Sequence, residues 1–259
     1  MNADSSAKSD RSAGVAHYLP LWIGSEIRGR VRLDLLPAVL ECAELERFDA
    51  GVRLKDQQVS RSARSRLLQS VALQLRRRGL IADWRNELCA VLDSTGSEIA
   101  RCERGVFRTL GIQNRAVHIN GVRADGRLWV ARRSELKRAD PGKLDNLAAG
   151  GVAAGESFKR SAMRELWEEA GVPRALALKV DFPGVVIRSL RETMFGVHDQ
   201  QVIVADLMVP DDFEPLGRDG EVAEFLCLTA DEIRAALDAA EFTVEAGLAI
   251  RECLERRAL

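Results

Sequence analysis

A glycine-rich loop that leads into an acidic helix constrains this chain more than any other stretch of its sequence. Residues 150–172 read GGVAAGESFKRSAMRELWEEAGV. In a helix, Glu165, Glu168 and Glu169 would span an arc of roughly 100°. The neighbouring arc carries small and apolar side chains, namely Ala162, Met163, Leu166 and Ala170. The three carboxylates therefore lie at the edge of a face that packs on the fold, where partial burial makes like charges costly.

Three interpretations of this acidic stretch compete. Acidic positions on a helix most often form a solvated face. The spacing of Gly150 and Gly155 matches a phosphate-binding P-loop, but Glu156 stands where that loop needs a lysine and would repel phosphate. A bound cation would instead relieve the crowded charge, and oxygen-only ligands favour Mg²⁺ or Mn²⁺. The helix arc alone leaves the solvated face and the divalent-metal site both open.

Charge and cysteine usage exclude several classes of function. The formal net charge of −1 argues against a nucleic-acid partner, which would require a strongly basic surface. Arginines cluster between residues 61 and 85, but the run at 76–78 closes a predicted helix, where cations meet the C-terminal dipole. Five scattered cysteines without a CxxC motif indicate buried thiols of a reducing compartment. No apolar run is long enough for a bilayer or a signal peptide, so we predict a cytoplasmic protein without a membrane partner. A homodimer is compatible with the sequence.

The pattern along the chain predicts three segments: a disordered tail at 1–14, an α+β module at 15–110 and a second domain at 111–259. In the module, we expect a hairpin at 19–32, helices at 34–45 and 62–78, and a strand at 87–93. The second domain has predicted strands at 116–120, 127–134 and 144–151, then a helix at 157–170 that ends at Gly171. Strands at 178–190, 197–208 and 221–227 follow, then a helix that Thr229 and Glu232 begin as a capping box, and a last helix at 243–256. This order indicates a mixed sheet flanked by helices.

The full spacing of the acidic stretch points to one family. Glu156 follows Gly150 after five residues, and Arg164-Glu165-Leu166 follows after seven more; Glu168-Glu169 and Gly171-Val172 complete the pattern. At average residue usage, such a match has a chance of roughly one in a million or less in a chain of this length. The stretch resembles the Nudix box, G-x5-E-x7-R-E-U-x-E-E-x-G-U with U aliphatic, at every position.

The resemblance implies a Nudix hydrolase with an α/β/α sandwich and a mixed sheet. In that family the box glutamates hold divalent cations that bridge the substrate's diphosphate. Carried over, Glu165, Glu168 and Glu169 are metal ligands, and one of them orients or deprotonates the attacking water. Glu156 and Arg164 would form an ion pair that joins loop to helix. Gly150 and Gly151 would let the backbone approach the metal and the phosphate.

Such sites often recruit one more acid from outside the box. Here the segment GRDGEVAEF offers Glu221 and Glu224, of which we rank Glu221 first as a metal ligand. The alternative is that both acids are simply exposed.

The wider sequence resembles the Nudix subfamily related to the one fused to thiamine pyrophosphokinase in some fungi. The resemblance is strongest at 115–172, and the segments LPLWIGSEIRGRVR, GLIADWRNELCAVLD and FRTLGI resemble the extra N-terminal domain of those proteins. It implies hydrolysis of a small-molecule diphosphate, namely thiamine diphosphate or its damaged oxo and oxy analogues, to the monophosphate and phosphate. That would be a housecleaning activity.

Several residues before the box are candidates for binding this substrate. Arg132 and Arg133 lie on a predicted strand, where alternation allows only one of them to face the site. Lys143 is a candidate phosphate contact. Trp129 could stack on an aromatic ring, although a tryptophan in a strand is more often part of the core. His118, in an apolar strand, is more consistent with a buried structural histidine.

Three other functions remain open from the sequence. The first is a diphosphatase of nucleoside diphosphate-X compounds such as ADP-ribose. Isopentenyl diphosphate isomerisation also uses a Nudix-like fold, but the chain lacks the cysteine-plus-glutamate context of that enzyme. A non-catalytic, ligand-sensing regulator is the third, although such proteins usually carry a degraded box and a DNA-binding helix pair.

Overall fold

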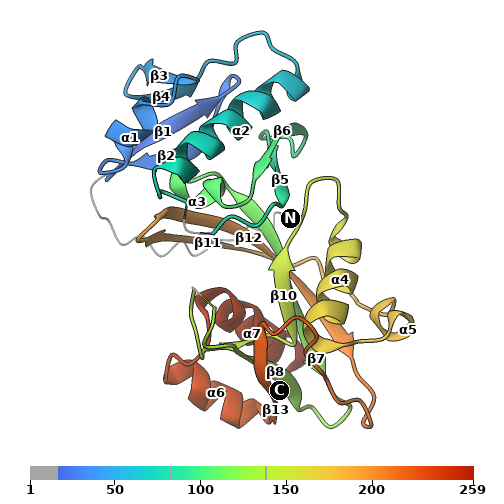
Figure 1. Cartoon of the computed structure of the whole chain (residues 1–259). Helices are drawn as coiled ribbons and strands as arrows, with labels where there is room; N and C mark the ends of the chain where they lie inside the picture. Colours follow the sequence, from blue (N-terminus) through green and yellow to red (C-terminus); the bar gives the residue numbers. More distant parts are fainter. Residues whose placement is uncertain (1–16, 82, 138) are drawn as a thin grey trace, which may run out of the picture.

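A computed structural model describes residues 17–81, 83–137 and 139–259, so the predicted tail at 1–14 lies outside the described residues. The N-terminal part contains a four-stranded sheet with the order β2-β1-β4-β3 and a separate β5-β6 hairpin (Figure 1). Its elements are β1 (Tyr18–Ile23), β2 (Glu26–Arg32), α1 (Leu36–Leu40), β3 (Leu45–Phe48), β4 (Gly51–Leu54), α2 (Arg61–Arg77), β5 (Leu88–Leu92), β6 (Glu98–Glu103) and α3 (Val106–Leu110). The predicted hairpin, the helix at 62–78 and the strand at 87–93 are present.

The helix predicted at 34–45 is wrong over most of its length. Only Leu36–Leu40 is helical, and Leu45 begins β3, which pairs antiparallel with β4. The chain turns between these strands at Asp49, whose φ is 49°. Leu45 and Leu54 are paired in the ladder and both are buried, so sheet pairing and burial override the helical periodicity of the segment.

The second part is built on one mixed sheet with the strand path β11-β12-β7-β8-β13. Strand β7 pairs parallel with β12 and antiparallel with β8 and β10, while β9 pairs with β8. The elements are β7 (Asn114–Val122), β8 (Leu128–Arg133), β9 (Leu144–Asp145), β10 (Ala148–Gly151), α4 (Phe158–Ala170), α5 (Arg174–Ala177), β11 (Val186–Thr193), β12 (Gly196–Met208), β13 (Val222–Leu228), α6 (Ala230–Asp238) and α7 (Val244–Arg257). The strand predicted at 178–190 therefore begins late, at Val186.

Helices cover both faces of this sheet, which makes the predicted α/β/α sandwich. Alternate residues of β12 divide between the two layers: Ile203 and Leu207 join the core under α4, while Val202 and Val204 pack with Ala249 of α7. The alternation follows from the two-residue period of a strand. Helices α4 and α7 accordingly lie on opposite sides of the strands in Figure 1.

The N-terminal part has a hydrophobic core of its own. All buried members of that cluster fall between Leu21 and Ile112, whereas the three clusters of the second part begin at Val117. On this separation we propose the division of the chain near residues 110–111. Among the described residues, no helix combines the length and the apolar character that crossing a membrane would require.

Candidate metal and diphosphate site

The helix α4 is placed by capping at both ends and by its apolar face. The Ser157 hydroxyl accepts a hydrogen bond from the Arg160 N–H at 3.3 Å, and Gly171 ends the helix with φ of 63°. Ala162, Leu166 and Ala170 are buried against the sheet. Because Glu165 and Glu169 adjoin this face, the packing of the helix turns their carboxylates toward the end of β10 rather than into bulk solvent.

Glu165 is held in a space that only glycine can leave open. A Cβ at Gly150 would overlap the Glu165 carboxylate, whose Oε2 would lie 2.6 Å away. Arg164 donates to Glu165 Oε1 at 2.7 Å and to Glu168 Oε2 at 3.2 Å. The ion pair predicted between Arg164 and Glu156 is present at 3.1 Å, and Arg164 also donates to the Gly151 carbonyl. Loop and helix are thus joined through one guanidinium.

Burial and neighbouring carboxylates raise the proton affinity of Glu165 and Glu169. Burial raises the pKa of Glu165 to about 7. The nearby Glu168 carboxylate also raises this pKa, whereas the Arg164 guanidinium lowers it. Burial, Glu165 and Asp145 raise the pKa of Glu169 well above its ordinary value, although Glu169 accepts a hydrogen bond from the Ala149 N–H at 2.8 Å. A divalent cation would remove this repulsion, and carboxylate oxygens suit Mg²⁺ or Mn²⁺. The residues present therefore fit the implied metal.

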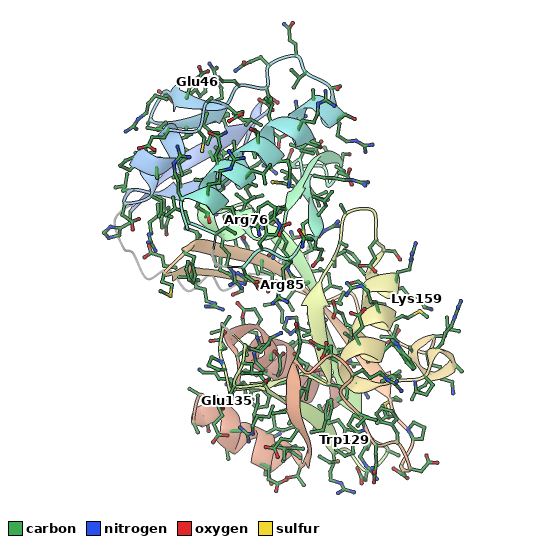
Figure 2. The ribbon with its side chains drawn as sticks, in the orientation of Figure 1. Glu46, Arg76, Arg85, Trp129, Glu135 and Lys159 are labelled. Atoms are coloured by element: carbon green, nitrogen blue, oxygen red, sulfur yellow. The ribbon has the colours of Figure 1, made fainter. Side chains whose placement is uncertain are left out.

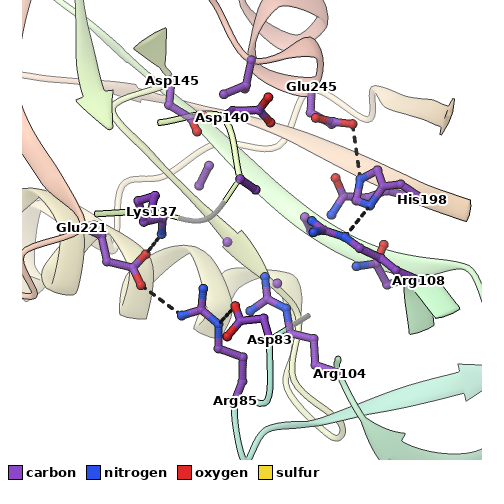
Figure 3. A pocket seen from close by; sticks show the side chains of 18 of the residues that line it. Asp83, Arg85, Arg104, Arg108, Lys137, Asp140, Asp145, His198, Glu221 and Glu245 are labelled. Atoms are coloured by element: carbon purple, nitrogen blue, oxygen red, sulfur yellow. Dashed lines mark hydrogen bonds and ion pairs between the residues drawn. The ribbon is translucent and has the colours of Figure 1, made fainter. Parts of the chain in front are cut away.

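The loop before β13 brings two more acids to the same place. Glu169, Asp219 and Glu221 each offer a carboxylate oxygen, and these oxygens lie within 4.8 Å of one another. Glu221 also accepts from Arg85 at 3.2 Å and from Lys137. Although burial works to raise it, these two cations lower the pKa of Glu221. Figure 3 shows Glu221 with both partners at the edge of the cavity.

A cavity of about 620 Å³ opens beside these carboxylates. Most of the predicted site residues line it, namely Gly150, Gly151, Arg164, Glu165, Glu168, Glu169, Glu221 and Arg133. The carboxylates of α4 and of the loop before β13 thus line one space that can hold a small molecule.

Two of the predicted substrate contacts lie outside the cavity wall. Arg132 pairs with Glu224 at 2.6 Å, whereas Arg133 faces inward and pairs with Asp145 at 2.8 Å, because neighbouring residues of a strand point to opposite faces. Lys143 also points away and donates to the Ala240 carbonyl at 3.3 Å. Arg132 and Lys143 are therefore not placed to bind a substrate in this cavity.

The two aromatic candidates near the box differ in position. Trp129 packs against the core under α4 and does not line the cavity, in agreement with its interpretation as a core residue. His118 is buried, as expected, with Nδ1 2.8 Å from Asn146 Oδ1, but its ring also borders the cavity.

Sequence reasoning missed several residues of this cavity. Asp219 stands two positions before Glu221, so only its spacing from that acid could have signalled it. Lys137 and Asp140 belong to the connection between β8 and β9, for which no motif applies. Arg85, Arg104 and Arg108 come from the N-terminal part, and nothing in their local sequence marks them as site residues.

The family comparison agrees with this geometry. The NUDIX domain model matches residues 113–256, which is more than half of the chain. The chain belongs to the NUDIX domain family. The crystal structure of the DR0079 protein from Deinococcus radiodurans is similar to this chain in fold, with a TM-score of 0.50 and 22% identity over 64% of this chain and 99% of that one.

Two curated relatives from Arabidopsis thaliana are named Nudix hydrolases. Nudix hydrolase 20, chloroplastic, is 32% identical over 89% of this chain and 65% of its own length. Nudix hydrolase 24, chloroplastic, is 34% identical over 66% of this chain and 47% of its own. This NUDIX chain thus spans about half to two thirds of the length of these relatives. Because the domain itself accounts for 113–256 only, the 89% match must include most of the N-terminal part as well.

Proposed function

We propose that this Nudix protein is a divalent-metal-dependent hydrolase of small-molecule diphosphates. Its substrate is thiamine diphosphate or an oxo or oxy analogue, which it cleaves to the monophosphate and phosphate. The observation that carries the activity is a single cavity lined by carboxylates for a metal and by cationic side chains. A phosphoanhydride needs both, because charge on the phosphoryl oxygens must be neutralised while a water is made nucleophilic.

The proposed metal ligands come from α4 and from the loop before β13. Glu165, Glu168 and Glu169 would hold the ion from the helix, and Glu221 would add a ligand from the loop. When bound, Mg²⁺ supplies charge neutralisation and an activated water. One of the three box carboxylates would also accept the proton of the attacking water as general base. Arg164 would keep the set in place through its contacts to Glu165 and Glu168.

Two residues that line the cavity suit a flat, positively charged ring. The partly exposed Phe195 lines the cavity, and so does Asp140, whose carboxylate pairs with Arg191 at 3.6 Å. An aromatic ring attracts a cationic partner through its negative face, and a carboxylate adds charge complementarity. These features support a thiazolium-bearing substrate, and the sequence resemblance to the thiamine-related subfamily supports it independently.

The test is a comparison of substrates with purified protein. In the presence of Mg²⁺, phosphate release should be measured with thiamine diphosphate and oxythiamine diphosphate, and AMP formation with ADP-ribose. We expect release from the two thiamine compounds and loss of release when EDTA removes the metal. Formation of AMP from ADP-ribose alone would replace the thiamine proposal by the nucleoside diphosphate-X alternative. Absence of turnover with all three would favour a ligand-sensing regulator.

A pair of variants tests the metal-ligand assignment. Glu168→Gln removes one charge from the proposed ligand set and should lower the hydrolysis rate by roughly 10²-fold or more. Glu224→Gln removes the same charge from the surface pair with Arg132 and should leave the rate within about twofold. Full activity of the Glu168 variant would refute the assignment.

A cytoplasmic location and a homodimer remain predictions from the sequence.

A further inference from the structure

The N-terminal part of the chain forms one wall of the cavity. Asp83, Arg85, Glu87, Arg104, Phe107 and Arg108 all line it. Figure 2 places Arg85 where the N-terminal part meets the Nudix domain. None of these residues lies within 113–256, so the family match assigns no function to this wall.

Arg104 lies directly against the glycine loop of the Nudix box. The atoms nearest to a Cβ at Gly151 would be those of the Arg104 guanidinium, with Cζ at 2.8 Å and both terminal nitrogens at 3.0–3.1 Å. One of these nitrogens donates to Glu87 at 3.0 Å. Arg104 is also close enough to Glu165 to lower the proton affinity of that carboxylate. A guanidinium from the N-terminal part therefore borders the proposed metal site.

Arg108 lies farther along the same wall and has no acidic partner. Its Nε donates to His198 Nδ1 at 3.3 Å, and His198 in turn lies 3.3 Å from Glu245. Within 17–81, 83–137 and 139–259, no carboxylate lies within ion-pair distance of Arg108. Figure 3 shows this chain of contacts, with Arg104 and Arg108 on the same side of the cavity.

The surroundings of Arg108 destabilise the positive charge of its guanidinium. Burial, together with Arg191 and Arg104, lowers the pKa of Arg108. Arg85 and Arg191 are different, because their guanidinium groups already pair with carboxylates: Asp83 and Glu221 for Arg85, Glu245 and Asp140 for Arg191. Arg104 pairs with Glu87 through one terminal nitrogen, and its guanidinium lies against the glycine loop, whereas Arg108 lines the cavity without a carboxylate partner among the described residues. A largely buried cation without a carboxylate partner favours binding of an anion.

We propose that the N-terminal module completes the active site by supplying Arg104 and Arg108 as a binding wall for the substrate's diphosphate. A cation held by the carboxylates of α4 would neutralise part of the charge of the diphosphate, and the two guanidinium groups would neutralise the rest. Arginine suits this role because its planar fork donates two parallel hydrogen bonds to a phosphoryl group. The identity of the ligand rests on the proposed function, whereas the wall itself rests on the geometry above.

Binding of a non-hydrolysable diphosphate tests this wall without relying on turnover. Methylenediphosphonate should be titrated calorimetrically into the full chain in the presence of Mg²⁺. We expect Arg108→Gln and Arg104→Gln to weaken its binding about tenfold or more each. Arg108→Lys keeps the charge and should retain part of the affinity. Arg66→Gln, at an exposed position of α2 outside the cavity, is the matched control for the loss of one charge.

A second variant separates the wall from a merely structural link between the two parts. Gly151→Ala keeps every charge but places a methyl group against the Arg104 guanidinium, so it should also weaken diphosphonate binding. Thermal unfolding of each variant checks that the fold persists. Affinity of the Arg108→Gln protein within twofold of the Arg66→Gln control would overturn the proposal, and so would absence of binding by the unsubstituted protein.

The binding experiment and the hydrolysis assay can fail independently of each other. If no thiamine compound or ADP-ribose is hydrolysed but diphosphonate binding depends on Arg104 and Arg108, the wall stands and the enzymatic proposal fails. If hydrolysis occurs while both arginine variants bind diphosphonate normally, the enzymatic proposal stands and the wall fails.

Discussion

Replacement of Gly150 by alanine tests how the glycine loop positions the proposed metal ligands. The added Cβ would overlap the whole Glu165 carboxylate, since even its farthest atom, Oε2, would lie only 2.6 Å away. Ordinary contact between such atoms requires about 3.5 Å. The carboxylate must therefore move by about 1 Å or more. Backbone strain would not contribute to the effect of Gly150→Ala, because Gly150 is not among the glycines with positive φ.

The expected cost falls on function more than on stability. The group in the way is the end of a side chain, so the fold can adjust, and we expect a loss of about 1–3 kcal/mol in the free energy of unfolding. A displacement of about 1 Å in a catalytic constellation can lower a rate roughly 10²-fold. Glu165 is also held by Arg164 at 2.7 Å, so the displaced carboxylate would have to break that contact.

The assay compares Mn²⁺ affinity, hydrolysis rate and thermal unfolding with those of a matched variant. Gly217→Ala serves as the control, because its Cβ would meet no atom closer than 3.5 Å and its φ is not positive. We expect Gly150→Ala to lose metal affinity and about two orders of magnitude in rate while Gly217→Ala changes little. If the two variants have the same metal affinity and rate, the argument that Gly150 makes room for Glu165 is refuted.

Two further predictions concern other acids. Glu221→Gln should weaken Mn²⁺ binding about tenfold or more, because the Glu221 and Glu169 carboxylates lie in one cluster. Glu224→Gln should leave Mn²⁺ binding unchanged, and equal Mn²⁺ affinities of the two variants would contradict the role of Glu221. Burial alone would raise the pKa of Asp206, but hydrogen bonds from Asn120, Arg256 and Arg257 lower it below its ordinary value. The charged form of Asp206 therefore stabilises the fold above about pH 4, and this contribution is lost as the pH falls through the folded-state pKa. Denaturant unfolding should show Asp206→Asn less stable by about 1.5–3 kcal/mol at pH 7, and the difference should shrink below about pH 4; a difference independent of pH would contradict it.

The sequence predicts the acidic helix from a local pattern, and it predicts the Nudix fold through the resemblance of that stretch to the Nudix box. The helix at 157–170 follows from a 3.6-residue period between Ser157 and Gly171, and the observed α4 begins one residue later. The wrong helix at 34–45 shows the limit of this reasoning, since the pairing of β3 with β4 decided that segment. Local periodicity could not anticipate a partner strand that follows after a short turn.

What the sequence by itself determined is the set of carboxylates on α4, since their spacing places them on one helix edge whatever surrounds it. Only the tertiary structure decided which other groups face them. Glu221 meets Glu169 across 52 positions, and Arg104 reaches Gly151 across 47, and no local pattern encodes such approaches. The physical reason is that charges act through space, so partners of opposite sign are selected by how the sheet, α4 and the N-terminal module pack together.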